Sequence, residues 1–257
     1  MAFCRRIVRE STTAEAPSLS LADLHCHTVY SDGLSTPEKM AYEASLRGIQ
    51  ILAITDHLSS GEYISQVKFQ QYLERCSRVE VRELVIVPGV EVSSLEGDIV
   101  CLLPSFRLSR GSPEIRGGKP AEETIEAIHG LGGLALAAHP FRKRGVGEKL
   151  LKLRFDGMEI GSPLTMEQAE KWNLALVGSS DAHTRLGLGA SYTCIDEDLS
   201  GGGQGSVTGL LEALRRKRSS ARTPKRGIVL RRMDKTRWFR PDYTARAVFR
   251  RMTFRRM

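Results

Sequence analysis

The sequence lacks the features that mark secreted, membrane-spanning and disulfide-rich proteins. Its five cysteines are scattered without a CxxC pair, and their odd number cannot close entirely into disulfides. No apolar run is long enough to span a membrane, and the first twenty residues contain no apolar segment typical of a signal peptide. The sequence therefore predicts reduced thiols and a cytoplasmic location.

Acidic residues are scarce only in the last part of the chain. From Arg215 onward, seventeen lysines and arginines stand against two acids, whereas the first 214 residues hold 21 basic and 28 acidic side chains. The net charge of +8 is thus the sum of an acidic body and a strongly basic tail. We predict three parts: an N-terminal extension over residues 1–20, a globular domain over 21–214 and a basic tail over 215–257.

The basic tail interleaves arginine with aromatic residues, which are Trp238, Phe239, Tyr243, Phe249 and Phe254. Arginine and aromatic side chains together can follow a nucleic-acid backbone and stack on bases. The same composition suits an anionic membrane surface. A third interpretation is that the tail docks on the acidic body of its own or a neighbouring subunit. The sequence leaves all three open, together with the oligomeric state.

Short continuous apolar runs, such as IQILAITDH and ELVIVPGVE, recur along the body and favour strands buried on both faces. Amphipathic stretches over 35–48, 61–84 and 119–133 lie between them and are typical of helices, the first with Ser35 or Thr36 as N-cap. The glycine-rich stretch 196–209 reads as a linker, followed by a last helix from residue 206. This alternation predicts a parallel α/β fold, most simply a barrel.

Histidines and carboxylates follow the apolar runs where strands are expected to end. The carboxyl ends of parallel strands in a barrel meet on one face, so these side chains can converge. Residues at i and i+2 of a strand face the same side, so His25 and His27 can reach one ion. The same holds for Asp181 and His183, although a loop could divide them between neighbouring ions. Imidazole mixed with carboxylate favours zinc, manganese or iron.

Three other residues near this pattern have simpler interpretations. His129 lies near the end of the helix predicted over 119–133, where a structural role beside the helix dipole is expected. Asp56 could be a ligand or could orient a neighbouring imidazole. Cys26 is expected to point away from the two histidines that flank it, as a packing residue.

The ordered motifs DLHCHTVYSDG, ITDH, PGVE, AHP and SSDAH resemble the PHP (polymerase and histidinol phosphatase) family of metal-dependent phosphoesterases. The resemblance covers roughly residues 21 to 195, within the predicted globular domain. It implies a distorted (β/α)7 TIM-like barrel, two or three divalent ions (manganese, iron or zinc), and hydrolysis of phosphate esters.

The resemblance also implies a ligand set. The first ion would be held by His25, His27, Glu91 and Asp181, and a second would share Glu91 and add Asp98 and His139. The third would be held by Asp32, His57 and His183. Many relatives have histidine where this chain has Asp98, and a carboxylate there favours harder ions such as manganese or iron.

The chemistry expected of such a site is attack on phosphorus by a metal-activated hydroxide. Positive side chains would stabilise the phosphoryl oxygens, and Arg142, Lys143 and Arg185 follow ligand positions closely enough to bind the substrate. Arg142 is the first choice, because an arginine shortly after His-Pro resembles the phosphate contact of some family members. A proton for the leaving oxygen could come from His183 or from a metal-bound water.

The substrate is predicted to be a small phosphomonoester or a nucleotide, because short spacings between the motifs leave little chain for a large recognition insertion. Two alternatives stay open. One is a nucleic-acid exonuclease of the same family. The other is a non-catalytic, metal-stabilised module that its basic tail delivers to nucleic acid or membrane.

Overall fold

The computed structural model describes the body of the chain. The described residues are 19–59, 66–109, 111, 113–160, 171–199, 201–225, 227–228 and 230. Nearly all of the predicted N-terminal extension, and the tail beyond residue 230 with its five aromatic residues, lie outside them. None of the helices in the described part has both the length and the hydropathy needed to cross a membrane.

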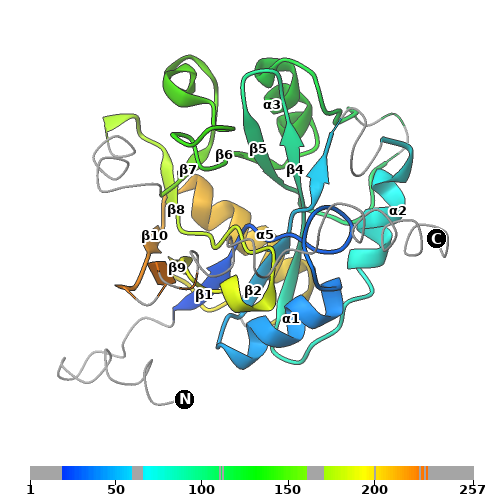
Figure 1. The fold of residues 1–257 in the computed structure, drawn as a ribbon, viewed down its shortest axis with the longest axis vertical. Coiled ribbons are helices and arrows are strands. Elements are labelled where there is room, and N and C mark those ends of the chain that lie inside the picture. Colours follow the sequence, from blue (N-terminus) through cyan, green and yellow to red (C-terminus); the bar gives the residue numbers. More distant parts are fainter. Residues whose placement is uncertain are drawn as a thin grey trace.

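A ten-stranded sheet forms the framework of the described residues. Its strands are β1 Ser20–Asp23, β2 Ile51–Ile54, β3 His57–Leu58, β4 Val85–Ser93, β5 Asp98–Leu102, β6 Leu134–Ala137, β7 Gly157–Glu159, β8 Ala175–Val177, β9 Tyr192–Ile195 and β10 Ser219–Arg222. They pair in the order β10-β9-β1-β2-β4-β5-β6-β7-β8, with β3 beside β4. The two ends of this order, β10 and β8, lie against each other, so the sheet curls into a nearly closed barrel (Figure 1).

The helices lie in or near the stretches that the sequence predicts, although the second ends at Cys76 and not at residue 84. They are α1 Pro37–Leu46, α2 Gln66–Cys76, α3 Ala121–Gly130 and α5 Gly203–Arg215, with 3-10 turns η2 Gly147–Lys152 and η3 Arg185–Gly187. Of the two predicted N-caps for α1, Thr36 takes the position, and its side chain accepts a hydrogen bond from the backbone N–H of Lys39.

Alternate residues of the strands face two different cores. Ala22, Ile51, Val87 and Val100 pack in one buried cluster with Leu210 of α5, which lies within the ring of strands in Figure 1. The residues between them pack outward against α1, α2 and α3 in a second cluster. The strands are therefore covered on both sides, as their continuous apolar runs predict.

The barrel is confirmed, but two details of the prediction are wrong. The sheet is mixed: β5 runs antiparallel to β4 and β6, and β9 runs antiparallel to β1 and β10. A four-residue turn joins β4 to β5, and a turn that short can only connect antiparallel strands. The predicted linker over 196–209 is helical from Gly203, because Val207 and Leu210 gain burial against the strands. In addition, residues 219–222 of the predicted tail form β10.

Candidate metal centre

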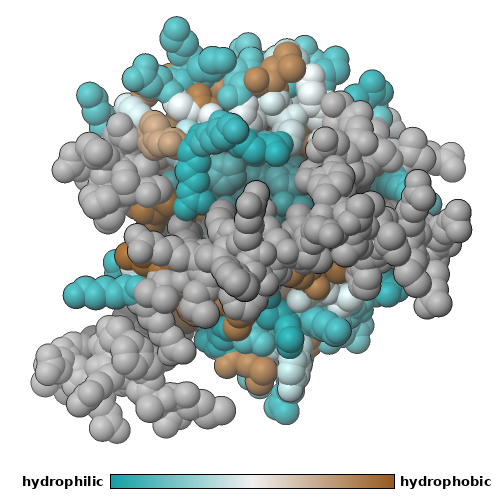
Figure 2. Space-filling view, in the orientation of Figure 1, coloured by the Kyte–Doolittle hydropathy of each residue, from teal (hydrophilic) through white to brown (hydrophobic). Residues whose placement is uncertain are grey.

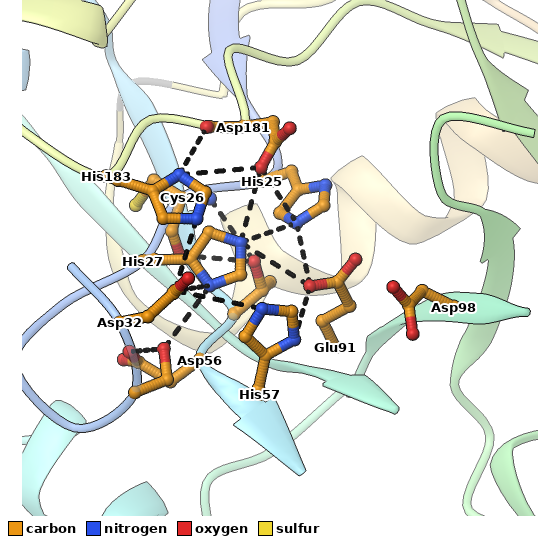
Figure 3. Close-up of polar contacts among 12 residues, drawn as sticks. His25, Cys26, His27, Asp32, Asp56, His57, Glu91, Asp98, Asp181 and His183 are labelled. Atoms are coloured by element: carbon orange, nitrogen blue, oxygen red, sulfur yellow. Dashed lines mark hydrogen bonds and ion pairs between the residues drawn. The ribbon is translucent and has the colours of Figure 1, made fainter. Parts of the chain in front are cut away.

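The polar side chains predicted at the strand ends lie together at one mouth of the barrel (Figure 3). His25 and His27 follow β1, and Asp181 and His183 follow β8. These two segments pair directly: His27 donates its backbone N–H to Ala182, and Asp181 donates its own to the carbonyl of His25. The pairing brings two motifs more than 150 residues apart in the sequence side by side.

Asp98 reaches the same mouth because β5 is antiparallel to its neighbours. It is the first residue of β5 and pairs with Ser93 near the end of β4, which also carries Glu91. His139 follows β6 on the other side of β5. Figure 3 shows Asp98 beside Glu91, away from the histidines that surround His27. A strand running in reverse thus contributes its first residue to an edge where the parallel strands contribute their last.

Three groups of these side chains have ligand atoms within 4.8 Å of one another. They are His27, Asp32, His57 and His183; His25, His27 and Asp181; and Glu91, Asp98 and His139. All nine predicted ligands belong to at least one group. The sequence left open whether Asp181 and His183 face one ion or two neighbouring ions, and in the structure they belong to different groups. It also places His27 in two groups, whereas the resemblance assigned it to the first ion alone.

Glu91 lies at the centre and joins the groups. Its Oε2 is 2.8 Å from Nδ1 of His57 and 3.4 Å from Nε2 of both His25 and His27, and its Oε1 is 3.1 Å from Nε2 of His139. Burial alone would raise the pKa of this carboxyl, but His57 and His25 outweigh it and hold the pKa well below its usual range. Glu91 therefore stays ionised in a fully buried position.

Buried atoms at the centre meet the requirements of a cation. Oε2 of Glu91, Oδ2 of Asp98, Oδ1 of Asp32 and Nδ1 of His139 are each buried and receive no hydrogen bond. Such atoms are costly to bury unless something satisfies them. Carboxylate and imidazole donors in this proportion suit zinc, manganese or iron. The residues present thus fit a divalent metal centre.

The backbone at two of the candidate ligands is strained. His139 has φ 30° and Asp181 has φ 52°, in the region that non-glycine residues rarely adopt. Strain of this kind collects at functional sites. Gly33, in the Ser-Asp-Gly turn after the first histidine pair, is required for a different reason: a Cβ there would lie 2.4 Å from the carbonyl oxygen of His27.

Of the predicted substrate-binding residues, only Arg142 reaches the centre. Its Nη1 donates to Oδ2 of Asp181 across 3.3 Å, and its side chain is partly exposed at the rim. Lys143 is exposed on the same loop, and Arg185 lines a separate pocket of about 390 Å³ with Thr184 and Glu43. Among the described residues, neither makes a hydrogen bond or ion pair to a candidate ligand. In Figure 2 the visible floor of the hollow on this face is hydrophilic.

Two polar residues that the sequence did not single out support the centre. Glu159, at the end of β7, has Oε1 2.8 Å from Nδ1 of His25, and its Oε2 accepts the backbone N–H of His139. Its place at the end of the apolar run FDGMEIGS was the available signal. Arg144 has Nε 3.0 Å from Oδ2 of Asp98. Nothing in the sequence distinguished it from the basic residues beside it.

Asp56 and Cys26 lie outside the three groups of candidate ligands. Asp56 accepts hydrogen bonds from Thr28 and from Oγ of Ser31, which in turn lies 3.3 Å from Nδ1 of His27. It therefore orients an imidazole from outside the three groups. Cys26 points away toward the carbonyl of Ala53.

His129 pairs with Asp156 at the end of α3, where Nε2 of the histidine is 2.9 Å from the carboxylate. The same carboxylate oxygen accepts the backbone N–H of Ala135 in β6. The contact thus ties α3 to the sheet; a structural role was predicted for His129, but beside the helix dipole and not through Asp156.

The imidazoles make the stability of the ion-free protein depend on pH in two directions. Burial lowers the pKa of His57, but the Glu91 carboxylate outweighs it and raises the pKa to about 9. Below pH 6.5 this stabilises the fold fully, and the contribution is lost as the pH rises toward 9. Burial, with His183 and His57 nearby, lowers the pKa of His27 to about 3, so its contribution is lost as the pH falls from 6.5 toward 3.

We therefore expect the melting temperature of chelator-treated protein to peak near pH 6.5. A scan from pH 4 to 10 measures this. His57→Gln is expected to flatten the decline on the alkaline side, because it removes the imidazole whose pKa is raised by Glu91. A melting temperature that rises steadily from pH 6.5 to 9 would contradict the assigned protonation of His57.

Fold and site together define a barrel protein with a buried cluster of imidazoles and carboxylates at its mouth. Comparison with known proteins gives this class a family. Residues 23–127 match the PHP domain, and residues 164–219 match the PHP-associated region. An uncharacterized protein of Methanocaldococcus jannaschii is 34% identical over 153 residues, which span 54% of this chain and 80% of that protein. The chain belongs to the PHP family, whose members bind several divalent ions and are typically metal-dependent hydrolases.

Solved structures share the fold at low sequence identity. A two-domain protein of Bacteroides vulgatus with a predicted PHP-like metal-dependent phosphoesterase aligns with a TM-score of 0.59 at 16% identity, over 86% of this chain and 71% of that one. Endonuclease Q, in complex with a 27-mer duplex that has an abasic lesion at the active site, aligns with a TM-score of 0.54 at 18% identity. The alignment covers 69% of this chain and 53% of Endonuclease Q.

Proposed function

We propose that the protein hydrolyses phosphate esters at this centre, with a small phosphomonoester or a nucleotide as substrate. The observation that carries the proposal is the convergence of nine ligand-type side chains around the buried carboxylate of Glu91. Divalent ions bound there would supply an acidic water near neutral pH and positive charge for the phosphoryl group. The three groups would hold two or three such ions.

The residues of the chain have separate tasks in this proposal. Glu91 would be shared between two ion sites, since its two oxygens face different groups. Asp181 would hold an ion through Oδ1, which is 3.4 Å from His27, while its Oδ2 accepts from Arg142. Arg142 would then bind the phosphoryl oxygens beside that ion, as an arginine fork suits phosphate.

His183 is the candidate proton donor to the leaving oxygen. Its Nε2 is 3.1 Å from Oδ1 of Asp32, and its ring stacks on His27 with centroids 4.3 Å apart. In that position it can serve as a ligand or, alternatively, transfer a proton.

A nucleic-acid phosphodiester is the second candidate substrate. The likeness to Endonuclease Q and the basic composition of residues 215–257 favour it. A shortened chain tests the part played by the tail, and it should end after residue 230 because β10 belongs to the sheet. If the tail only delivers the enzyme to nucleic acid, truncation reduces binding to an oligonucleotide and leaves hydrolysis of a small ester intact.

Hydrolysis of para-nitrophenyl phosphate and of its bis-ester by manganese-loaded protein tests the proposed function. The monoester is expected to be the better substrate, and Asp181→Ala is expected to reduce turnover by about a thousandfold. Asp196→Ala, at an exposed aspartate, is the matched control. No turnover of either ester or of an oligonucleotide with manganese, iron or zinc would favour the non-catalytic module.

A further inference from the structure

Arg144 lies against the carboxylate of Asp98, one of the proposed ligands. Its Nε is 3.0 Å from Oδ2 of Asp98, and its Nη2 donates to Oγ of Ser93 across 3.0 Å. The Asp98 side chain is 3% exposed and the Arg144 side chain 54% exposed, so the arginine reaches inward from the rim. A positive charge of the chain itself therefore touches the Glu91, Asp98 and His139 group.

The backbone holds this contact in place. Asp98 donates its N–H to the carbonyl of Arg144 across 2.8 Å. Gly97 allows the close approach, because a Cβ there would lie 2.9 Å from that carbonyl and 2.6 Å from the nitrogen of Val146. Gly145 is packed equally closely, because a Cβ there would lie 2.4 Å from the carbonyl oxygen of His139. The loop after His139 is thus packed against the β4–β5 turn, which places Arg144 where it meets Asp98.

Arg144 and a bound ion would compete for the carboxylate of Asp98. Oδ2 of Asp98 is close to the guanidinium but receives no aligned hydrogen bond, so its lone pairs remain available to an ion. A divalent ion held by this group would lie near the guanidinium, and both would contact Oδ2 of Asp98. Repulsion between the two cations and division of the carboxylate charge both weaken binding of the ion. Asp32, in the His27, Asp32, His57 and His183 group, faces imidazoles and no arginine among the described contacts.

We infer that Arg144 is a positioning residue that lowers the affinity of the Glu91, Asp98 and His139 group for a divalent ion. This rests on the proposed function, because it supposes that the three groups hold ions. The chain would then bind its ions with unequal strength. The ion at Asp98 would exchange more readily than an ion held by the His27, Asp32, His57 and His183 group, so its occupancy would depend on the metal concentration.

Titration of the chelated full-length protein with Mn²⁺, followed by electron paramagnetic resonance of free Mn²⁺, tests this inference. Arg144→Gln is expected to tighten the site at Asp98 on the order of tenfold, a value that allows for solvent screening of the exposed arginine. Arg144→Lys keeps a positive charge and is expected to keep that site weak. Lys143→Gln removes a charge from the same loop without a contact to Asp98, and it should change the affinity by less than about twofold.

Arg144→Gln in an Asp98→Asn protein tests whether Arg144 acts through Asp98. Asp98→Asn is expected to remove or weaken the same site, and adding Arg144→Gln to it should produce a smaller gain than in the wild-type protein, because the carboxylate charge is no longer divided between arginine and ion. Unchanged or weaker Mn²⁺ binding in Arg144→Gln would overturn the inference, as would an equal gain in the Asp98→Asn background. Wild-type protein that binds no Mn²⁺ would overturn both this inference and the metal centre. Bound Mn²⁺ that is insensitive to Arg144 would overturn the inference alone.

Discussion

Glu91→Gln is expected to abolish hydrolysis, with kcat/KM lowered by about a thousandfold or more. The side chain is fully buried and lies within 3.4 Å of four imidazoles, and its two oxygens contact members of all three candidate ion groups. Glutamine keeps the shape but loses the charge, and its amide nitrogen is not a ligand for these ions. The loss should therefore appear in metal content as well as in turnover.

The matched control is Glu122→Gln, at an exposed position in the first turn of α3. It should leave metal content and hydrolysis unchanged. A Glu91→Gln protein that keeps more than about a tenth of the wild-type activity would show that this carboxylate does not hold the ions. Circular dichroism of both variants separates loss of the centre from loss of the fold.

Glu159→Gln is expected to weaken metal binding by about ten- to a hundredfold while leaving the maximal rate largely recoverable at high Mn²⁺. Oε1 of Glu159 lies 2.8 Å from Nδ1 of His25, and Oε2 accepts the backbone N–H of His139. This contact directs the proton of His25 to Nδ1 and leaves Nε2 to face the centre. A glutamine offers one acceptor where two are needed, so either His25 changes tautomer or the His139 N–H loses its partner.

The dependence on Mn²⁺ distinguishes a positioning role from a direct one. If Glu159 acts only through His25 and His139, the variant shows an altered metal requirement and approaches the wild-type rate when saturated. A low rate at every Mn²⁺ concentration, with wild-type metal affinity, would contradict that role and place Glu159 among the residues that touch substrate.

The positions of the candidate ligands could be predicted because they depend on rules that act locally. A polar residue directly after a buried strand must lie at the edge of the sheet, and residues two apart face the same side. His25, His27, Asp181 and His183 follow these rules, and the structure brings them together. Their role as metal ligands stays a prediction until an ion is measured.

The direction of β5 could not be predicted, because a strand buried on both faces has the same continuous apolar pattern in either direction. The helical start of α5 was missed for a different reason. Glycine disfavours helix by about 1 kcal/mol per residue, and only burial of Val207 and Leu210 against the strands overrides that preference. Glu159 and Arg144 were missed because their importance lies in contacts with residues distant in the sequence or across a loop.

Metal content and hydrolysis measured on the same sample test the central claim most directly. The protein is treated with a chelator, divided, and one part is reloaded with Mn²⁺; ions per chain and turnover of para-nitrophenyl phosphate are then determined. The proposed centre predicts no turnover in the chelated part, and recovery with two or three Mn²⁺ bound per chain in the other. Full turnover in protein that contains no metal would contradict it.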